Sequence, residues 1–101
     1  MKKVKEYGNL ILEKYQDGNT AVILGPNEEY DEFSSILSVN LVESSLYPKR
    51  FFFVDINNIP NAEEILKENK IATSTGKVAK SGFVTYPQYE LTDKIIKEYN
   101  L

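Results

Sequence analysis

The side chains that could carry out chemistry in this chain are carboxylates, hydroxyls and lysines, because its 101 residues include no cysteine and no histidine. Without cysteine there can be no disulfide, no thiolate nucleophile and no cysteine-ligated zinc site. Without histidine, the side chain that most often serves as a general base is missing as well. The composition therefore predicts a protein that is not an enzyme and that holds no metal.

Acidic residues are concentrated in one short segment, Glu28-Glu29-Tyr30-Asp31-Glu32. Its spacing differs from that of a calcium-binding loop, which alternates oxygen ligands around a central glycine and ends in a glutamate. No neighbour is evident that would raise the pKa of one carboxylate, as a catalytic pair requires. Two interpretations stay open: a solvated acidic turn, or an anionic surface that docks on a basic groove. In the second case the partner-binding residues are Glu28, Glu29, Asp31 and Glu32.

Cations alternate with aromatic rings near the end of the chain, at Lys77, Lys80, Phe83, Tyr86 and Tyr89. Lysines can neutralise phosphates and rings can stack on bases, so this group predicts a second partner-binding surface, one suited to nucleic acid. A chain with a net charge of −3 lacks the basic footprint that is usual for such proteins. The alternative is that the rings belong to the core and the lysines are simply exposed.

The segment 73–77, Thr-Ser-Thr-Gly-Lys, invites comparison with a phosphate-binding loop. In that pattern a first glycine would stand at Ile71 and a hydroxyl at Val78, and neither is present. We therefore expect no nucleotide and no other cofactor. The polar, acid-free residues 71–82 are interpreted as an exposed loop.

The elements that must position these residues are organised around the stretch 51–69. Phe51 to Val54 are aromatic or β-branched without interruption, which predicts a strand covered on both faces. Asn61 after Pro60 is a favoured N-cap, so a helix is expected to follow. The apolar face of this helix would pack on the strand; it consists of Ala62, Ile65 and Leu66.

A hairpin is expected over residues 9–24, with its turn at Asp17-Gly18, because this dipeptide between strand-like runs accepts the positive φ of tight turns. A third strand is predicted from Phe33 to Val42, where apolar and polar residues alternate with period two. Short consecutive strands with compact connections favour an antiparallel arrangement.

Residues 83–89 alternate weakly and predict an edge strand, the place where Pro87 would be tolerated. Thr92 can cap a final helix with a narrow apolar stripe. The predicted fold class is α+β: an antiparallel sheet of four to five strands with a helix packed on one face and a short C-terminal helix.

Length and composition predict one domain over residues 1–101, since no Pro/Gly/Ser-rich linker divides the chain and 42% of its residues are hydrophobic. The apolar run near the N-terminus, Leu10-Ile11-Leu12, is too short for a signal peptide, and no stretch approaches the length of a membrane span. We therefore expect the protein in the cytoplasm.

Two segments resemble motifs of a bacterial domain of unknown function that is carried by plasmids, conjugative elements and phages. One is Asp-x-Asn-Asn-x-Pro, at Asp55, Asn57, Asn58 and Pro60; the other is Gly-Phe-x-x-Tyr-Pro-x-Tyr, at Gly82, Phe83, Tyr86, Pro87 and Tyr89. The similarity covers roughly residues 6–91. The chain differs from the family pattern at Asn61, where a tryptophan is common, and at Val84, where a cysteine is common.

Within that setting the small acidic chain looks like an anti-CRISPR protein directed against a type II effector, Cas9 or its complex with guide RNA. The resemblance implies a non-enzymatic inhibitor that blocks guide-RNA loading or DNA binding, with the acidic segment facing the positive channels of Cas9. An alternative is a nucleic-acid-binding accessory protein of a conjugative element or phage that uses Lys77, Lys80 and the nearby rings. A third hypothesis, an acid/base hydrolase, would require turnover that depends on a single carboxylate.

Overall fold

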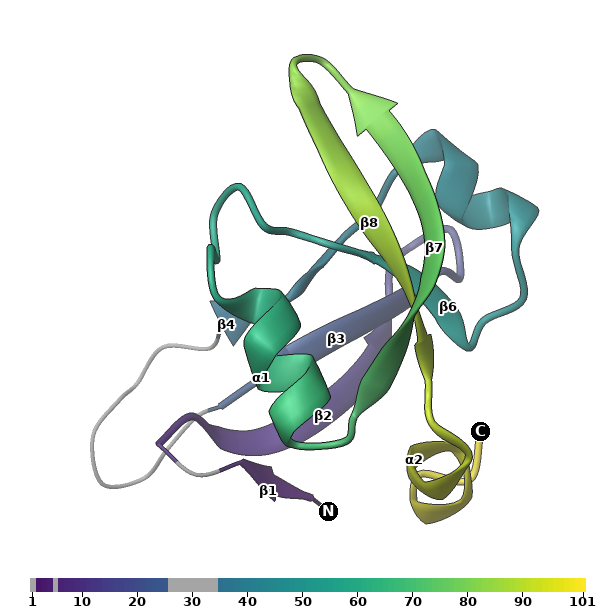
Figure 1. The fold of residues 1–101 in the computed structure, drawn as a ribbon. Coiled ribbons are helices and arrows are strands. Elements are labelled where there is room, and N and C mark those ends of the chain that lie inside the picture. The colour runs from purple at the N-terminus through teal and green to yellow at the C-terminus, as the bar shows by residue number, and fades with distance from the viewer. Residues whose placement is uncertain (1, 5, 26–34) are drawn as a thin grey trace.

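The strands of this protein form two antiparallel sheets of four strands each in the computed structural model, which describes residues 2–4, 6–25 and 35–101. The strand order is β1-β2-β3-β4 in the first sheet and β5-β6-β8-β7 in the second (Figure 1). The elements in chain order are β1 (Lys3–Val4), β2 (Gly8–Lys14), β3 (Thr20–Leu24), β4 (Ser35–Ile36), β5 (Ser38–Val39), the 3₁₀ helix η1 (Val42–Leu46), β6 (Phe51–Val54), α1 (Ala62–Glu68), β7 (Ala72–Ser81), β8 (Val84–Leu91) and α2 (Asp93–Glu98). The α+β class and both helices are confirmed, while the strands are shared between two sheets.

The predicted first hairpin is present as β2 and β3, which pair from Leu10–Leu24 to Lys14–Thr20. Gly18 has a φ of +88°, a conformation that glycine adopts without steric cost. The carboxylate of Asp17 accepts hydrogen bonds from the Asn19 backbone N–H (3.1 Å) and from the Asn40 side-chain amide (2.8 Å). The turn is therefore tied to the segment that follows β5.

The chain crosses from the first sheet to the second at Leu37. This fully buried residue donates its N–H to the carbonyl of Val22 in β3 and accepts the N–H of Asp55 just after β6, both at 2.8 Å. The predicted third strand therefore passes from one sheet to the other at Leu37, as β4 and then β5. Its expected start at Phe33 lies outside the described residues, and Val42 begins the 3₁₀ helix instead of ending the strand.

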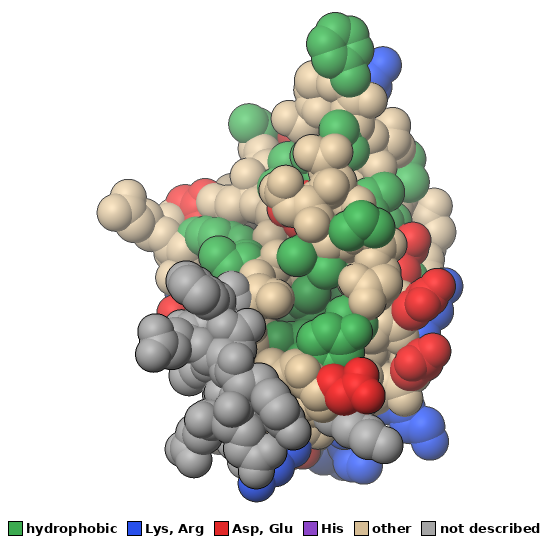
Figure 2. All heavy atoms as spheres, turned by 90° about the vertical axis from the view of Figure 1, so that its left-hand side faces the viewer, with side chains coloured by type: hydrophobic (Ala, Val, Ile, Leu, Met, Phe, Trp, Pro, Cys, Tyr) green, Lys and Arg blue, Asp and Glu red, His purple; other side chains and the backbone are tan. Residues whose placement is uncertain are grey.

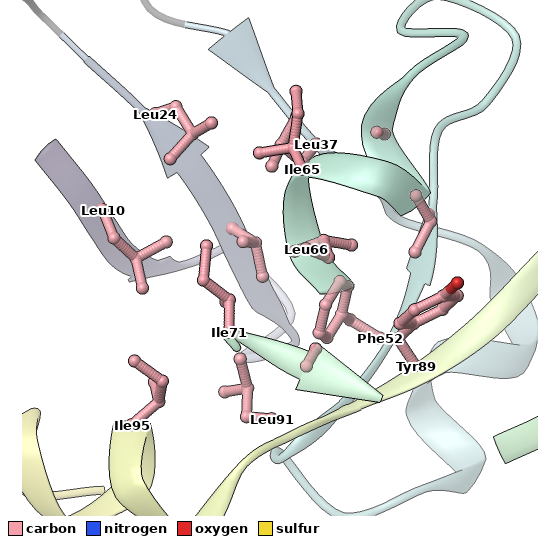
Figure 3. Close-up of a cluster of buried hydrophobic side chains, with 14 of the residues drawn as sticks. Leu10, Leu24, Leu37, Phe52, Ile65, Leu66, Ile71, Tyr89, Leu91 and Ile95 are labelled. Carbon is pink, nitrogen blue, oxygen red and sulfur yellow. The ribbon is translucent and has the colours of Figure 1, made fainter. Parts of the chain in front are cut away.

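The prediction that β6 is covered on both faces is confirmed. Phe52 and Val54 lie in the main core, while Phe53 faces a second cluster with Leu41, Ala79 and Tyr86. Figure 3 shows the main core, in which side chains from both sheets and both helices point toward one another. Because its side chains alternate between the two clusters, β6 connects them. Burying one phenylalanine side chain stabilises a fold by about 1.5 to 3 kcal/mol.

The helix α1 begins after Asn61 as expected, but the Asn61 side chain does not cap it. Its amide instead donates to the hydroxyl of Tyr7 at 3.1 Å. The turn before the helix is held by Asp55, whose carboxylate accepts the backbone N–H of Asn58 (3.2 Å) and its side-chain amide (2.8 Å). The segment Asp55–Pro60 therefore forms the connection between β6 and α1.

The segment 71–82, which we expected to be an exposed loop, is mostly the ten-residue strand β7. Its partner β8 lies between β6 and β7, so it is not the edge strand that we predicted. Pro87 is tolerated in this inner strand because it pairs with Val78, next to a register shift between Ser74 and Val78. Gly76, with a φ of +84°, lies within that irregularity.

The helix α2 is capped by Thr92, whose hydroxyl accepts the N–H of Ile95 at 3.4 Å, as predicted. Arg50 holds the start of this helix: its guanidinium contacts the carboxylates of Glu90 (2.8 Å) and Asp93 (2.6 Å) and donates to the carbonyl of Leu91. Within the described residues, no helix is long and apolar enough to cross a bilayer.

The Arg50–Asp93 pair predicts how stability responds to acid. Hydrogen bonding to Arg50 holds the pKa of Asp93 below its ordinary value of 3.8, so the pair stabilises the fold above that pH and the contribution is lost as pH falls through the folded-state pKa. We expect Asp93→Asn to lower Tm at pH 7, with a difference from the unaltered protein that shrinks as the pH falls below 3.8 and through the lowered folded-state pKa. Thermal unfolding followed by circular dichroism measures both. A difference that does not change with pH would contradict the ion pair, and Glu13→Gln, an exposed change on β2, is the control.

Candidate functional site

The β7–β8 hairpin projects from the body of the molecule (Figure 1). Its turn is formed by Gly82, whose φ is +62°, and Phe83, which is fully exposed to solvent. Figure 2 shows the projection from another side as a narrow extension that ends in a hydrophobic side chain. Placing an exposed phenylalanine ring against a partner would remove its apolar surface from water, which favours binding.

The two lysines predicted for this site lie on opposite faces of the hairpin. Lys77 extends toward the second apolar cluster, with its Nζ 5.2 Å from the centre of the Tyr47 ring. Lys80 pairs with Thr85 and directly follows Ala79, which faces that cluster, so the alternation of the strand turns Lys80 the other way. Both lysines are exposed. They therefore flank the hairpin, and they do not form one flat surface with the rings.

Tyr86 does not lie on the predicted partner-binding surface. Its side chain is buried in the second cluster with Phe53, Ala79 and Leu41. The cluster packs β7 and β8 against β6 and the start of η1 on one face of the second sheet. Tyr86 therefore supports the hairpin and is not available for stacking on a base.

Tyr89 is likewise removed from the surface, because its ring is fully buried in the main core (Figure 3). Its hydroxyl donates a 2.8 Å hydrogen bond to the carboxylate of Glu63 in α1. Burial, followed by the hydrogen bond to Glu63, raises the pKa of Tyr89 well above its ordinary value. The expected stacking role is corrected: Tyr89 attaches β8 to α1.

The hairpin differs in charge from the rest of the chain. From residue 70 to residue 89 the sequence contains three lysines and no acid, whereas the remainder contains nine lysines and arginines and all 15 acids. In Figure 2 the acidic side chains of the visible face lie mainly along the right-hand side of the body, with a few at the left, and the tip of the projection shows none. The hairpin has a single acid, Glu90 at its base, so the part that projects is cationic in an otherwise acidic protein.

A second group of lysines lies at the base of the hairpin and was missed by the sequence analysis. Lys67, Lys70 and Lys94 line a surface hollow of ≈ 370 Å³ together with Thr73 and Thr92. These lysines come from the end of α1, the connection to β7 and the start of α2. Only the packing of two helices beside one strand brings them together, so no local pattern in the sequence could have shown it.

The remaining candidate residues occupy other places. Asp55 and Asn58, in the connection between β6 and α1, line a hollow of ≈ 470 Å³ with Tyr15 and Asn40, but their carboxylate and amide groups already bond to each other. The acidic group Glu28, Glu29, Asp31 and Glu32 lies outside the described residues. In the ranges that the structure describes, no three acidic side chains are grouped as a metal site.

Comparison with known proteins places the chain in one family. Residues 9–101 match a family model described as a domain of unknown function, DUF4313. No curated protein and no solved structure matches the chain.

Proposed function

The chain belongs to the DUF4313 family, and we propose that it is a non-enzymatic domain that binds nucleic acid through the β7–β8 hairpin, as an accessory protein of a conjugative element or phage. The observation that carries this proposal is the fully exposed ring of Phe83 at the tip of a projecting hairpin that bears Lys77 and Lys80 near that tip, while its one acid, Glu90, lies at the base and pairs with Arg50. Two of the five residues that the sequence suggested, Tyr86 and Tyr89, form the support of this surface.

The physical basis of binding is the release of counterions. Each lysine that neutralises a phosphate frees condensed cations, and the gain in entropy makes affinity fall with rising salt. Phe83 adds an aromatic face on which an unstacked base can lie. The acids elsewhere on the protein repel the polyanion, so they orient it toward the hairpin.

A gel shift with short RNA and DNA at several salt concentrations tests the proposal. We expect a shifted band that weakens steeply as salt rises. The absence of a shift at low salt, with protein that is folded by circular dichroism, would contradict a nucleic-acid-binding function.

A second candidate is an inhibitor of bacterial CRISPR–Cas immunity that binds Cas9 in the host cytoplasm and blocks guide-RNA loading or DNA binding. The resemblance to anti-CRISPR proteins favours it, as does the acidic group at Glu28, Glu29, Asp31 and Glu32, which would complement the positive channels of Cas9. A pull-down from a lysate containing Cas9, with and without guide RNA, tests this candidate. Retention of Cas9 together with loss of its DNA cleavage is expected; neither effect requires a gel shift with free nucleic acid.

A further inference from the structure

On the basis of the proposed nucleic-acid function, we infer that its ligand is a single strand of RNA or DNA that lies along the outer edge of β7 and ends at Phe83. The edge carries lysines at both ends. Lys67, Lys70 and Lys94 surround the hollow at the base, while Lys77 and Lys80 flank the upper half. All five are exposed, and together they form a track, which we call the β7 track.

The length of the β7 track suits a short oligonucleotide. β7 has ten residues, which span about 33 Å at the rise of an extended strand. The side chains between the two groups of lysines include the exposed hydroxyls of Thr73 and Ser74, which can donate to phosphates. We expect a footprint near the lower end of the roughly 4 to 16 nucleotides that single-strand-binding folds cover.

The acids beside the track favour a single strand over a duplex. Next to α1, a hollow of ≈ 390 Å³ is lined by Glu6, Glu64 and Glu68. A duplex is wider than one chain, so its second strand would approach these carboxylates and be repelled. On the other side Arg50 pairs with Glu90 and Asp93, which reduces their repulsion of the strand on the track itself.

The features of β7 also argue against a protein strand as the occupant. β7 is the last strand of its sheet, and such an edge can pair with another chain. However, the register shift near Gly76 and the flanking lysines are the devices that prevent strand addition. A flexible polyanion tolerates the irregular backbone and uses the charges, whereas a β-strand partner does neither.

Fluorescence anisotropy with labelled oligo-dT, oligo-U and a DNA duplex of equal length tests this inference. With five lysines engaged, the slope of log K against log salt for a single strand is expected near roughly −3.5. Each change of a track lysine to glutamine should bring the slope about 0.7 closer to zero, whereas Lys3→Gln and Lys14→Gln, exposed positions on the first sheet, should leave it unchanged.

Variants of the lysines at the base of the hairpin, Lys70 and Lys94, test the β7 track independently of the proposed nucleic-acid-binding function. Failure of the full chain to bind any oligonucleotide would remove both. Binding that is unaffected by Lys70→Gln and Lys94→Gln, or that is as tight for the duplex or for anionic lipid vesicles as for the single strand, would overturn the β7 track alone.

The affinity of a Phe83 variant for a single strand tests whether a base stacks on this ring. Phe83→Ala should weaken single-strand binding by roughly 5- to 150-fold, since stacking on one base contributes about 1 to 3 kcal/mol. Leu46→Ala, which removes another exposed apolar side chain, at the end of η1 and outside the β7 edge, is the matched control and should change affinity less than twofold. Equal losses for the two variants would contradict a stacked base at Phe83.

Discussion

Replacing Tyr89 by alanine is expected to lower the free energy of unfolding by about 3 to 5 kcal/mol, the range for removing a large aromatic side chain from a core. The ring is fully buried among residues of both helices and both sheets. Its removal would leave a cavity and would also release Glu63 from its 2.8 Å hydrogen bond. Small domains are stable by only about 5 to 15 kcal/mol, so a large part of the stability would be lost. Urea denaturation followed by circular dichroism measures the change.

The control is another ring of the same hairpin. Phe83→Ala should change the free energy of unfolding by no more than about 0.5 kcal/mol, because Phe83 is fully exposed. Tyr89→Phe should fall between the two, since it keeps the ring and removes only the hydroxyl. If Tyr89→Ala were as stable as the unaltered protein and lost oligonucleotide binding instead, Tyr89 would be a contact residue and its burial would be contradicted.

The parts of the fold that were predictable are those in which local signals and packing agree. The aromatic run 51–54 indicated coverage on both faces, and the structure places Phe52 and Phe53 in different apolar clusters. The Asp17-Gly18 turn and the Thr92 cap are equally local features. Each of these elements could be identified because the residues that determine it are neighbours in the chain.

The strand β7 was missed because its composition resembles that of a loop. Segment 71–82 is polar since the strand is an edge, where most side chains face solvent. The pairing that makes it a strand comes from β8, which in turn rests on β6. Pro87 led us to predict that residues 83–89 form an edge strand. The irregularity in β7 that accommodates this proline is not visible in the sequence of β8.

The candidate site was predictable in part for a related reason. Lys77, Lys80 and Phe83 are exposed as expected, but Tyr86 and Tyr89 are buried on opposite faces of β8. Alternation along a strand shows which residues share a face, but it does not show which of the two faces is buried. Here both faces are covered near the base of the hairpin and open only near its tip, so position along the strand decides which rings are exposed.

Reversing the four charges of the acidic group is expected to have opposite effects under the two candidate functions. The variant is Glu28→Lys, Glu29→Lys, Asp31→Lys and Glu32→Lys, which changes the formal net charge from −3 to +5. If the protein inhibits Cas9 through this group, like charges would face its positive channels at a cost of several kcal/mol, and inhibition of DNA cleavage should be abolished. If the protein binds nucleic acid through the hairpin, the lost repulsion should tighten oligonucleotide binding. Titrations of Cas9 cleavage and of oligonucleotide anisotropy measure the two effects.

A control with the same change in net charge distinguishes a local contact from a general field. Reversal of four exposed acids elsewhere, Glu6, Glu13, Glu64 and Glu68, also gives +5. Because Glu6, Glu64 and Glu68 lie beside the β7 track, this variant is the control for Cas9 inhibition only. For oligonucleotide binding, any tightening in the first variant that comes from long-range attraction should be removed by salt screening, over a Debye length of about 10 Å at 0.1 M. Loss of Cas9 inhibition only in the first variant would assign the contact to the acidic group, because net charge alone cannot produce it. Full inhibition by the first variant would exclude that group from the mechanism and leave the hairpin as the surface that both candidate functions share.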